Sequence, residues 1–117
     1  MIVDNARSGL ANRLVQNTVA AVGWMAVGSG SGLIAVTTTG LFYHVDRNAF
    51  TSTDLTVANR ATMTTDWTFT ELSGTTVKEF AVYNLSSGGK AWQVEGFPGI
   101  LFDGSNELRV EATWEIF

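Results

Sequence analysis

The most suggestive chemical feature of this chain is a run of alternating glycine and serine at residues 28–32 (GSGSG). A glycine-rich turn after a strand can bind phosphate through free backbone N–H groups, provided that a helix follows it. Here residues 33–37 (LIAVT) follow, which is a strand-like stretch, and the run lacks a Gly-Lys-Thr ending. We therefore interpret the run as a flexible loop between strands.

His44 is the single histidine of the sequence, and Asp46 follows it two positions later. On a strand the two side chains would point the same way. A catalytic triad or a metal site needs a nucleophile or several more ligands, which this pair does not bring. The chain also lacks cysteine, which excludes disulfides, thiolate catalysis and cysteine-type zinc sites. We therefore expect His44 to be structural.

The acidic residues suggest neither calcium binding nor sugar hydrolysis. Asp103, Ser105, Asn106 and Glu107 cluster at a turn, but they lack the ligand spacing of an EF-hand, and an Asx-type turn accounts for them. Paired catalytic carboxylates must face one another across a cleft. We expect the glutamates to lie outward on strands or in turns, and these are Glu71, Glu79, Glu95, Glu107, Glu111 and Glu115. The sequence thus predicts a non-enzyme with no catalytic residues, no cofactor and no metal.

Four tryptophans could together form a stacking platform for a carbohydrate, and these are Trp24, Trp67, Trp92 and Trp114. Trp67 and Trp114 fall on the apolar face of their predicted strands, which favours core packing. The sequence around Trp92 does not decide which way its ring points. A carbohydrate-binding module for host-surface recognition therefore remains an alternative function.

Charge and hydropathy exclude two classes of partner. Seven basic residues are scattered along the chain with no two adjacent, and the net charge is −4. Neither a nucleic-acid footprint nor a polybasic membrane patch can be built from them. No apolar run is long enough to span a membrane, and the beginning (MIVDNAR) carries an acid where a signal peptide has a basic region. We expect a soluble protein made in the cytoplasm.

The elements that position these residues begin with a helix at about residues 4–16. Asp4 or Asn5 can cap its first turn. Apolar residues recur at helical spacing and predict a stripe that packs on an open sheet face, and these are Ala6, Leu10, Ala11, Leu14 and Val15.

The rest of the chain has the period of two that is typical of strands. In residues 61–70, Ala61, Met63, Trp67 and Phe69 share one face and threonines occupy the other. Further strands are predicted at residues 22–27, 33–39, 41–47, 55–58, 77–84, 90–95 (interrupted at Pro98-Gly99) and 108–116. Hairpin turns separate several of them, and no βαβ alternation is present. We predict one domain over residues 1–117, a mainly β antiparallel sandwich, jelly-roll-like or a small barrel, with one short N-terminal helix.

Four segments in this order resemble small structural proteins of tailed bacteriophages, often tail-fibre or related virion components. They are residues 24–32 (WMAVGSGSG), 75–84 (TTVKEFAVYN), 87–89 (SGG) and 108–116 (LRVEATWEI). The resemblance covers nearly the whole chain except residues 50–59. It implies a virion protein of the tail fibre, baseplate, neck or capsid decoration that carries no active site. Its partners would be other virion proteins and copies of itself. Because a virion subunit is repeated on a symmetric scaffold, we predict a homo-oligomer, a trimer or larger ring.

Overall fold

The computed structural model describes residues 1–116, which fold into one helix and seven strands. Their bounds are α1 Asp4–Val15, β1 Trp24–Gly28, β2 His44–Ala49, β3 Ser52–Asp54, β4 Arg60–Trp67, β5 Thr75–Tyr83, β6 Gln93–Phe102 and β7 Leu108–Glu115. Phe117 lies outside the described residues, and β7 ends at Glu115, one residue before the end predicted for the last strand.

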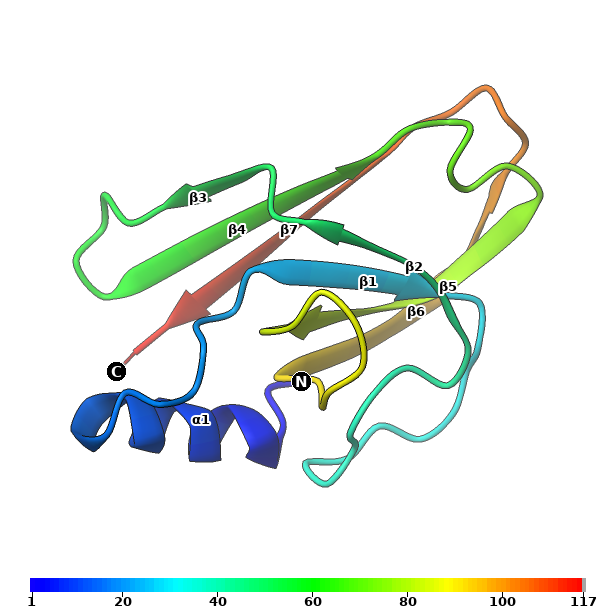
Figure 1. Ribbon diagram of the computed structural model, residues 1–117. Helices are drawn as coiled ribbons and strands as arrows, with labels where there is room; N and C mark the ends of the chain where they lie inside the picture. Colours follow the sequence, from blue (N-terminus) through cyan, green and yellow to red (C-terminus); the bar gives the residue numbers. More distant parts are fainter. Residues whose placement is uncertain (117) are drawn as a thin grey trace.

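The strands form two antiparallel sheets that pack as a sandwich (Figure 1). One sheet has the order β2-β1-β5-β6, and we call it sheet A; the other has the order β3-β4-β7, and we call it sheet B. The predicted mainly β antiparallel sandwich with a short N-terminal helix is therefore confirmed. Within residues 1–116, no helix is long and apolar enough to cross a membrane.

The main core lies between the two sheets, and alternation along β4 explains how it forms. Met63, Thr65 and Trp67 are buried on one side of β4, whereas the residues between them are more exposed. Met25, Val27, Val77, Val82 and Phe102 meet them from sheet A. Phe69, predicted on the same inner face, is instead exposed because β4 ends at Trp67.

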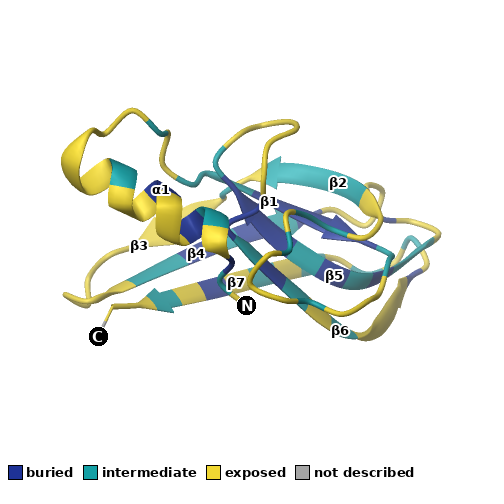
Figure 2. Ribbon diagram, turned by 90° about the horizontal axis from the view of Figure 1, so that it is seen from below, coloured by how far each residue is buried: buried dark blue, intermediate teal, exposed yellow. Residues whose placement is uncertain are grey.

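The outer face of sheet A is also buried, because the N-terminal segment and the loop at residues 29–43 cover it (Figure 2). Its buried residues are Val3, Ala26, Ala81, Tyr83, Ala91 and Val94. A register shift between Val77 and Glu79 in the β5–β6 pairing interrupts the alternation of β5. As a result Val77 faces the main core while Glu79, two residues later, lies under the covering loop.

The helix forms where it was predicted, but its cap and its buried face differ from the prediction. The N-cap residue is Val3, and no side chain caps it. The amide of Asp4 instead donates to the carbonyl of Val36 in the covering loop, so the loop satisfies part of the helix end. The buried helix residues are Ala6 and Gly9, while the other apolar residues of the predicted stripe (Leu10, Ala11, Leu14 and Val15) are exposed.

Several predicted strand positions are wrong. Residues 33–39 belong to the irregular covering loop, and β2 begins at His44 rather than at Leu41. The short strand expected at residues 55–58 is instead β3, at Ser52–Asp54. The last strand of sheet A starts at Gln93 rather than at Lys90, and it continues through Pro98 to Phe102. Pro98 is tolerated because β6 is an edge strand.

Candidate functional site

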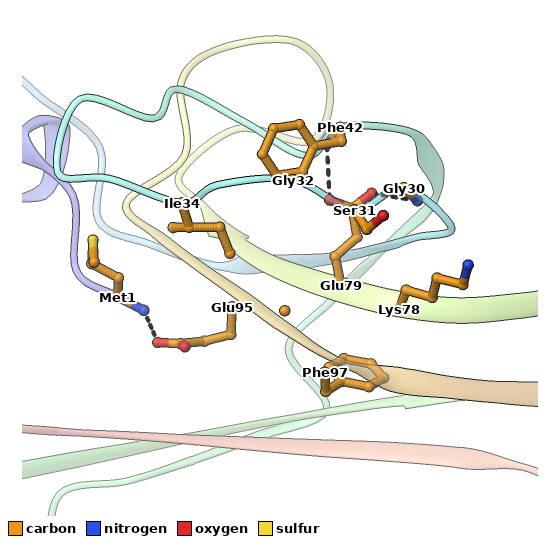
Figure 3. A pocket seen from close by; sticks show the side chains of 11 residues that line it. Met1, Gly30, Ser31, Gly32, Ile34, Phe42, Lys78, Glu79, Glu95 and Phe97 are labelled. Carbon is orange, nitrogen blue, oxygen red and sulfur yellow. Dashed lines mark hydrogen bonds and ion pairs between the residues drawn. The ribbon is translucent and has the colours of Figure 1, made fainter.

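The glycine–serine run lies over a buried carboxylate, which binds the backbone N–H groups that a phosphate would need. Glu79 is 1% exposed. Its Oε2 accepts a hydrogen bond from the amide of Gly30 at 2.9 Å, and its Oε1 accepts one from the amide of Phe42 at 2.8 Å (Figure 3). Oε2 also accepts one from the amide of Tyr43 at 2.9 Å. The prediction that Glu79 points outward is therefore wrong. The run is a loop that the protein's own anion holds in place.

The close approach of the loop to Glu79 explains a glycine in the run. A Cβ added at Gly30 would lie 2.6 Å from Cβ of Phe42 and 2.7 Å from the amide nitrogen of Tyr43. Contacts this short force the neighbouring backbone to move. Gly30 is thus needed for the covering loop to reach the carboxylate.

A cavity of about 420 Å³ lies beside the hydrogen bonds of Glu79, between the glycine–serine run and β6 (Figure 3). Ile34 and Phe97 line it, and Lys78 supplies a cation at its edge. The Met1 ammonium pairs with Glu95 at the other side and also donates to the Val94 carbonyl. Partial burial lowers the pKa of this ammonium below its usual value. Both acidic side chains of the cavity, Glu79 and Glu95, are thus bonded to groups of the chain itself.

His44 and Asp46 do not form a reactive centre. His44 is exposed at the start of β2, opposite Gly28, so it is not part of the core. Partial desolvation lowers the pKa of the imidazole, and the positive charge of Arg47 lowers it further, against the opposing effect of Asp46 and Glu79. Among residues 1–116, no group of three or more histidine or acidic side chains is arranged to hold a metal ion.

The tryptophans do not form an exposed platform. Trp67 is buried in the main core, as predicted, and Trp114 is partly buried against that core. Trp92 is buried beneath Gly9 of the helix and stacks on Trp114, with ring centroids 6.4 Å apart and planes 18° apart. The indole N–H of Trp114 donates to Oε1 of Gln93 at 2.6 Å. The two rings thus join the helix to both sheets, and a sugar could not reach the face of Trp92.

The acidic turn at residues 103–107 is an Asx-type turn, as predicted. Oδ1 of Asp103 accepts hydrogen bonds from the amide of Ser105 at 3.0 Å and from its hydroxyl at 2.6 Å. Oδ1 of Asn106 accepts one from the amide of Asp103. The bonds from Ser105 lower the pKa of Asp103. Local hydrogen bonding therefore accounts for the cluster.

The charges of β7 pair across to β4. Nε of Arg60 donates to Oε1 of Glu115 at 2.8 Å, and Nε of Arg109 donates to Oδ1 of Asp66 at 2.7 Å. The bond from Arg109 is the largest cause of a lowered pKa at Asp66. These charges lie on the exposed face of sheet B, where they form one ion pair near each end of the β4–β7 pairing.

An apolar groove that sequence reasoning missed lies between the helix and the end of sheet B. Its volume is about 340 Å³, and Leu10, Leu55, Trp114 and Ile116 line it. Leu10, Leu55 and Ile116 are substantially exposed. Their hydrophobic character was visible in the sequence, but Leu10, Leu55 and Ile116 were each assigned to a helix stripe or a strand and so to packing. The groove is the feature of this molecule that best fits a functional surface.

Comparison with known proteins finds no significant match, whether to a protein-family model, to a curated protein or to a solved structure. The resemblance to phage structural proteins therefore rests on the four sequence segments alone.

Proposed function

We propose that this chain is a non-enzymatic structural subunit that works by associating with other subunits, as the virion proteins of tailed bacteriophages do. The observation that carries the proposal is the exposed apolar surface at the helix end of the molecule. It consists of the groove together with Leu14 and Val15 on the next turns of α1. We call this the helix-end surface.

The helix-end surface is the kind that association stabilises. Monomeric soluble proteins rarely expose contiguous apolar patches larger than a few hundred Å², and such patches rimmed by polar groups mark interaction sites. Here Arg13, Arg60 and Glu115 form such a rim. Each aliphatic side chain contributes roughly 1.5–3 kcal/mol when it passes from full exposure to full burial. Several of them acting together can therefore offset the cost of association.

The chemistry of the other candidate features supports a structural role over a catalytic one. Glu79 and Glu95 are bonded within the chain, and His44 stands without a nucleophile. The carbohydrate-binding alternative depended on an exposed aromatic surface around Trp92, and that ring is buried. An assembly role needs none of these groups to react.

Charge insertion into the helix-end surface tests the proposal. We expect the wild-type chain to associate in a concentration-dependent way in sedimentation velocity. The double variant Leu14→Glu, Leu55→Glu should weaken that association, because two carboxylates would be desolvated at the contact. Leu33→Glu is the matched control, since Leu33 is 90% exposed and Leu14 86%, but Leu33 lies in the covering loop. Wild-type protein that stays monomeric up to its solubility limit would contradict the proposal.

The virion assignment has its own test. Mass spectrometry of purified particles of a phage that encodes this chain should detect it at the copy number of a repeated structural component. Its absence from such particles would limit the proposal to assembly outside a virion.

A further inference from the structure

A sandwich of two open sheets has four edge strands, which here are β2 and β6 in sheet A and β3 and β7 in sheet B. Exposed edges invite pairing with other chains, and monomeric proteins protect them with short strands, bulges, prolines or covering segments. Comparing the four edges therefore indicates which one is available to a partner.

Three of the edges carry such protection. Strand β3 is only three residues long, and the pairing of β2 with β1 contains a register shift. Strand β6 contains Pro98, which has no N–H, and the N-terminal segment covers its beginning. In that cover the amide of Val94 donates to the Met1 carbonyl at 2.9 Å, and Ile2 bridges to Gln93.

Strand β7 carries charged side chains, which can also discourage pairing, but it has none of the four protections found at the other edges. It is eight residues long, contains neither glycine nor proline, and pairs with β4 in unbroken register from Leu108 to Glu115. Its free edge is the longest regular edge in the described part of the chain.

The register with β4 shows which backbone groups of β7 face the free edge. The amide of Ile116 donates to Asn59, and the carbonyl of Thr64 accepts from Thr51 on the β3 side. Backbone groups alternate in direction along a strand, so even-numbered residues of β7 bond to β4. The N–H and C=O groups of Arg109, Glu111, Thr113 and Glu115 therefore face away from β4.

We propose that β7 pairs with β7 of a second copy of this chain, antiparallel and about a two-fold axis at Ala112. The two copies of sheet B then form one continuous sheet. This inference rests on the proposed function and deepens it, because it names the partner and the register of one contact. An isologous two-fold is the commonest contact in homo-oligomers. It differs from the trimer or ring predicted from the sequence, because a cyclic trimer has no two-fold axis, but assemblies with dihedral symmetry contain both kinds of axis.

The charges of β7 select this register. With the two-fold axis at Ala112, Arg109 lies opposite Glu115 of the second copy. The odd-numbered residues of each β7, whose N–H and C=O groups face the free edge, then lie opposite odd-numbered residues of the other β7. A shift of two residues one way places Glu111 opposite Glu111, and a shift the other way places Glu111 opposite Glu115. Like charges directly opposite are destabilising. A shift by one residue would bring the inner face of one strand against the outer face of the other.

The same register extends the ion pairs that each copy already has. Arg109 is bonded to Asp66 in its own chain, and Glu115 is bonded to Arg60. Across the joined sheet the row reads Asp66, Arg109, then Glu115 and Arg60 of the second copy, so that negative and positive charges alternate. On the inner face Ala112 lies opposite Ala112, a pair small enough for close approach.

Proline substitution at the free edge tests the proposal. Thr113→Pro removes an N–H that faces the second copy and leaves the bonds to β4 intact, so it should weaken dimerisation by about tenfold or more. The matched control is Thr53→Pro, which removes an outward N–H from the opposite edge of the same sheet. Sedimentation equilibrium on both variants in the Leu14→Glu, Leu55→Glu background isolates the β7 contact. We expect a dimer that Thr113→Pro alone converts to monomer.

A single cysteine tests the register even where a proline variant fails to fold. Residues opposite each other in a non-hydrogen-bonded antiparallel pair have Cα atoms about 4.5 Å apart, which is within disulfide range. Because the chain has no cysteine of its own, Ala112→Cys should give a covalent dimer under mild oxidation. Val110→Cys on the same face should not, since Val110 lies opposite Trp114.

The outcomes separate this inference from the proposed function. If the wild type associates and neither Thr113→Pro nor the cysteine pair behaves as stated, the β7 contact is wrong and assembly through the helix-end surface stands. If the wild type is monomeric at every concentration and Ala112→Cys does not cross-link, both proposals are overturned.

Discussion

Glu79 is a buried charge whose partners are backbone amides rather than a cation. Three N–H groups of the covering loop bond to its two oxygens, and charge-assisted hydrogen bonds of this kind are stronger than neutral ones. The carboxylate therefore holds together two parts of the loop that are more than ten residues apart in the sequence.

Removing this carboxylate should destabilise the fold and release the loop. We expect Glu79→Ala to lower the free energy of unfolding by about 2–4 kcal/mol, because it leaves buried N–H groups without acceptors. Urea denaturation measures the loss, and faster exchange of the amides of Gly30, Phe42 and Tyr43 locates it. Glu95→Ala is the control, with an expected cost below about 1 kcal/mol because the pair of Glu95 with the Met1 ammonium is partly exposed. An equal loss in the free energy of unfolding for the two variants would contradict the role of Glu79 in holding the loop.

His44 should give the fold a measurable pH dependence near neutrality. Because its pKa is lowered in the folded state, the unfolded chain binds a proton more readily, and stability falls as pH drops through about 6.5. The lowered pKa of the Met1 ammonium acts in the same direction at higher pH. The carboxylates with lowered pKa, such as Asp66, lose their contribution only at more acidic pH. His44→Gln should therefore flatten thermal stability between about pH 5.5 and 7, and an unchanged slope would contradict this assignment.

At the scale of elements, the helix α1 packs through a glycine rather than through its leucines. Gly9 lies against the six-membered ring of Trp92, where an added Cβ would collide with the ring. This contact turns the helix so that Leu10 and Leu14 face outward. A helical glycine usually weakens a helix, but here it permits close packing of helix and indole.

Gly9→Ala should therefore have the opposite outcome from what helix propensity suggests, and Gly23→Ala, outside the helix, is its control. In an open helix Gly9→Ala would stabilise by up to about 1 kcal/mol. Against Trp92 we expect it to destabilise by about 1–3 kcal/mol, because the packed ring must move. Gly23→Ala, with no atom within 4 Å of the added Cβ, should change stability by less than about 0.5 kcal/mol. Thermal unfolding of both variants checks this, and a stabilised Gly9→Ala would show that the helix does not pack on Trp92.

The sequence predicts best the elements whose own alternation decides their burial. The strands β4 and β7 appear within a few residues of their predicted bounds because apolar and polar residues alternate regularly along them. Residues 33–39 are as rich in β-branched residues as a strand, yet they form a loop, since Glu79 and the helix end hold them across the sheet. No local sequence pattern could indicate this loop, because its hydrogen bonds to Glu79 depend on a register shift in β5, about forty residues away in the sequence.

At the scale of the whole molecule, the two-layer sandwich could be predicted, but the surfaces that we propose for assembly could not. The rule that apolar residues lie inside assigned Leu10, Leu14 and Ile116 to packing, and the structure places all three outside. That rule works in one direction only, because folded proteins also expose much apolar surface. The free strand edges could not be predicted either. They depend on the order of strands in each sheet, and the alternation of residues within a single strand does not indicate that order.

The anchoring of the covering loop has a consequence for engineering. Both arms of the loop are fixed at Glu79, while Ser31, Gly32 and Leu33 between them are exposed. Lengthening a closed loop costs little entropy, about 0.6 kcal/mol for each doubling. A guest peptide grafted between Ser31 and Gly32 should thus be presented at the surface without disturbing either sheet, which makes this turn a natural point for epitope display.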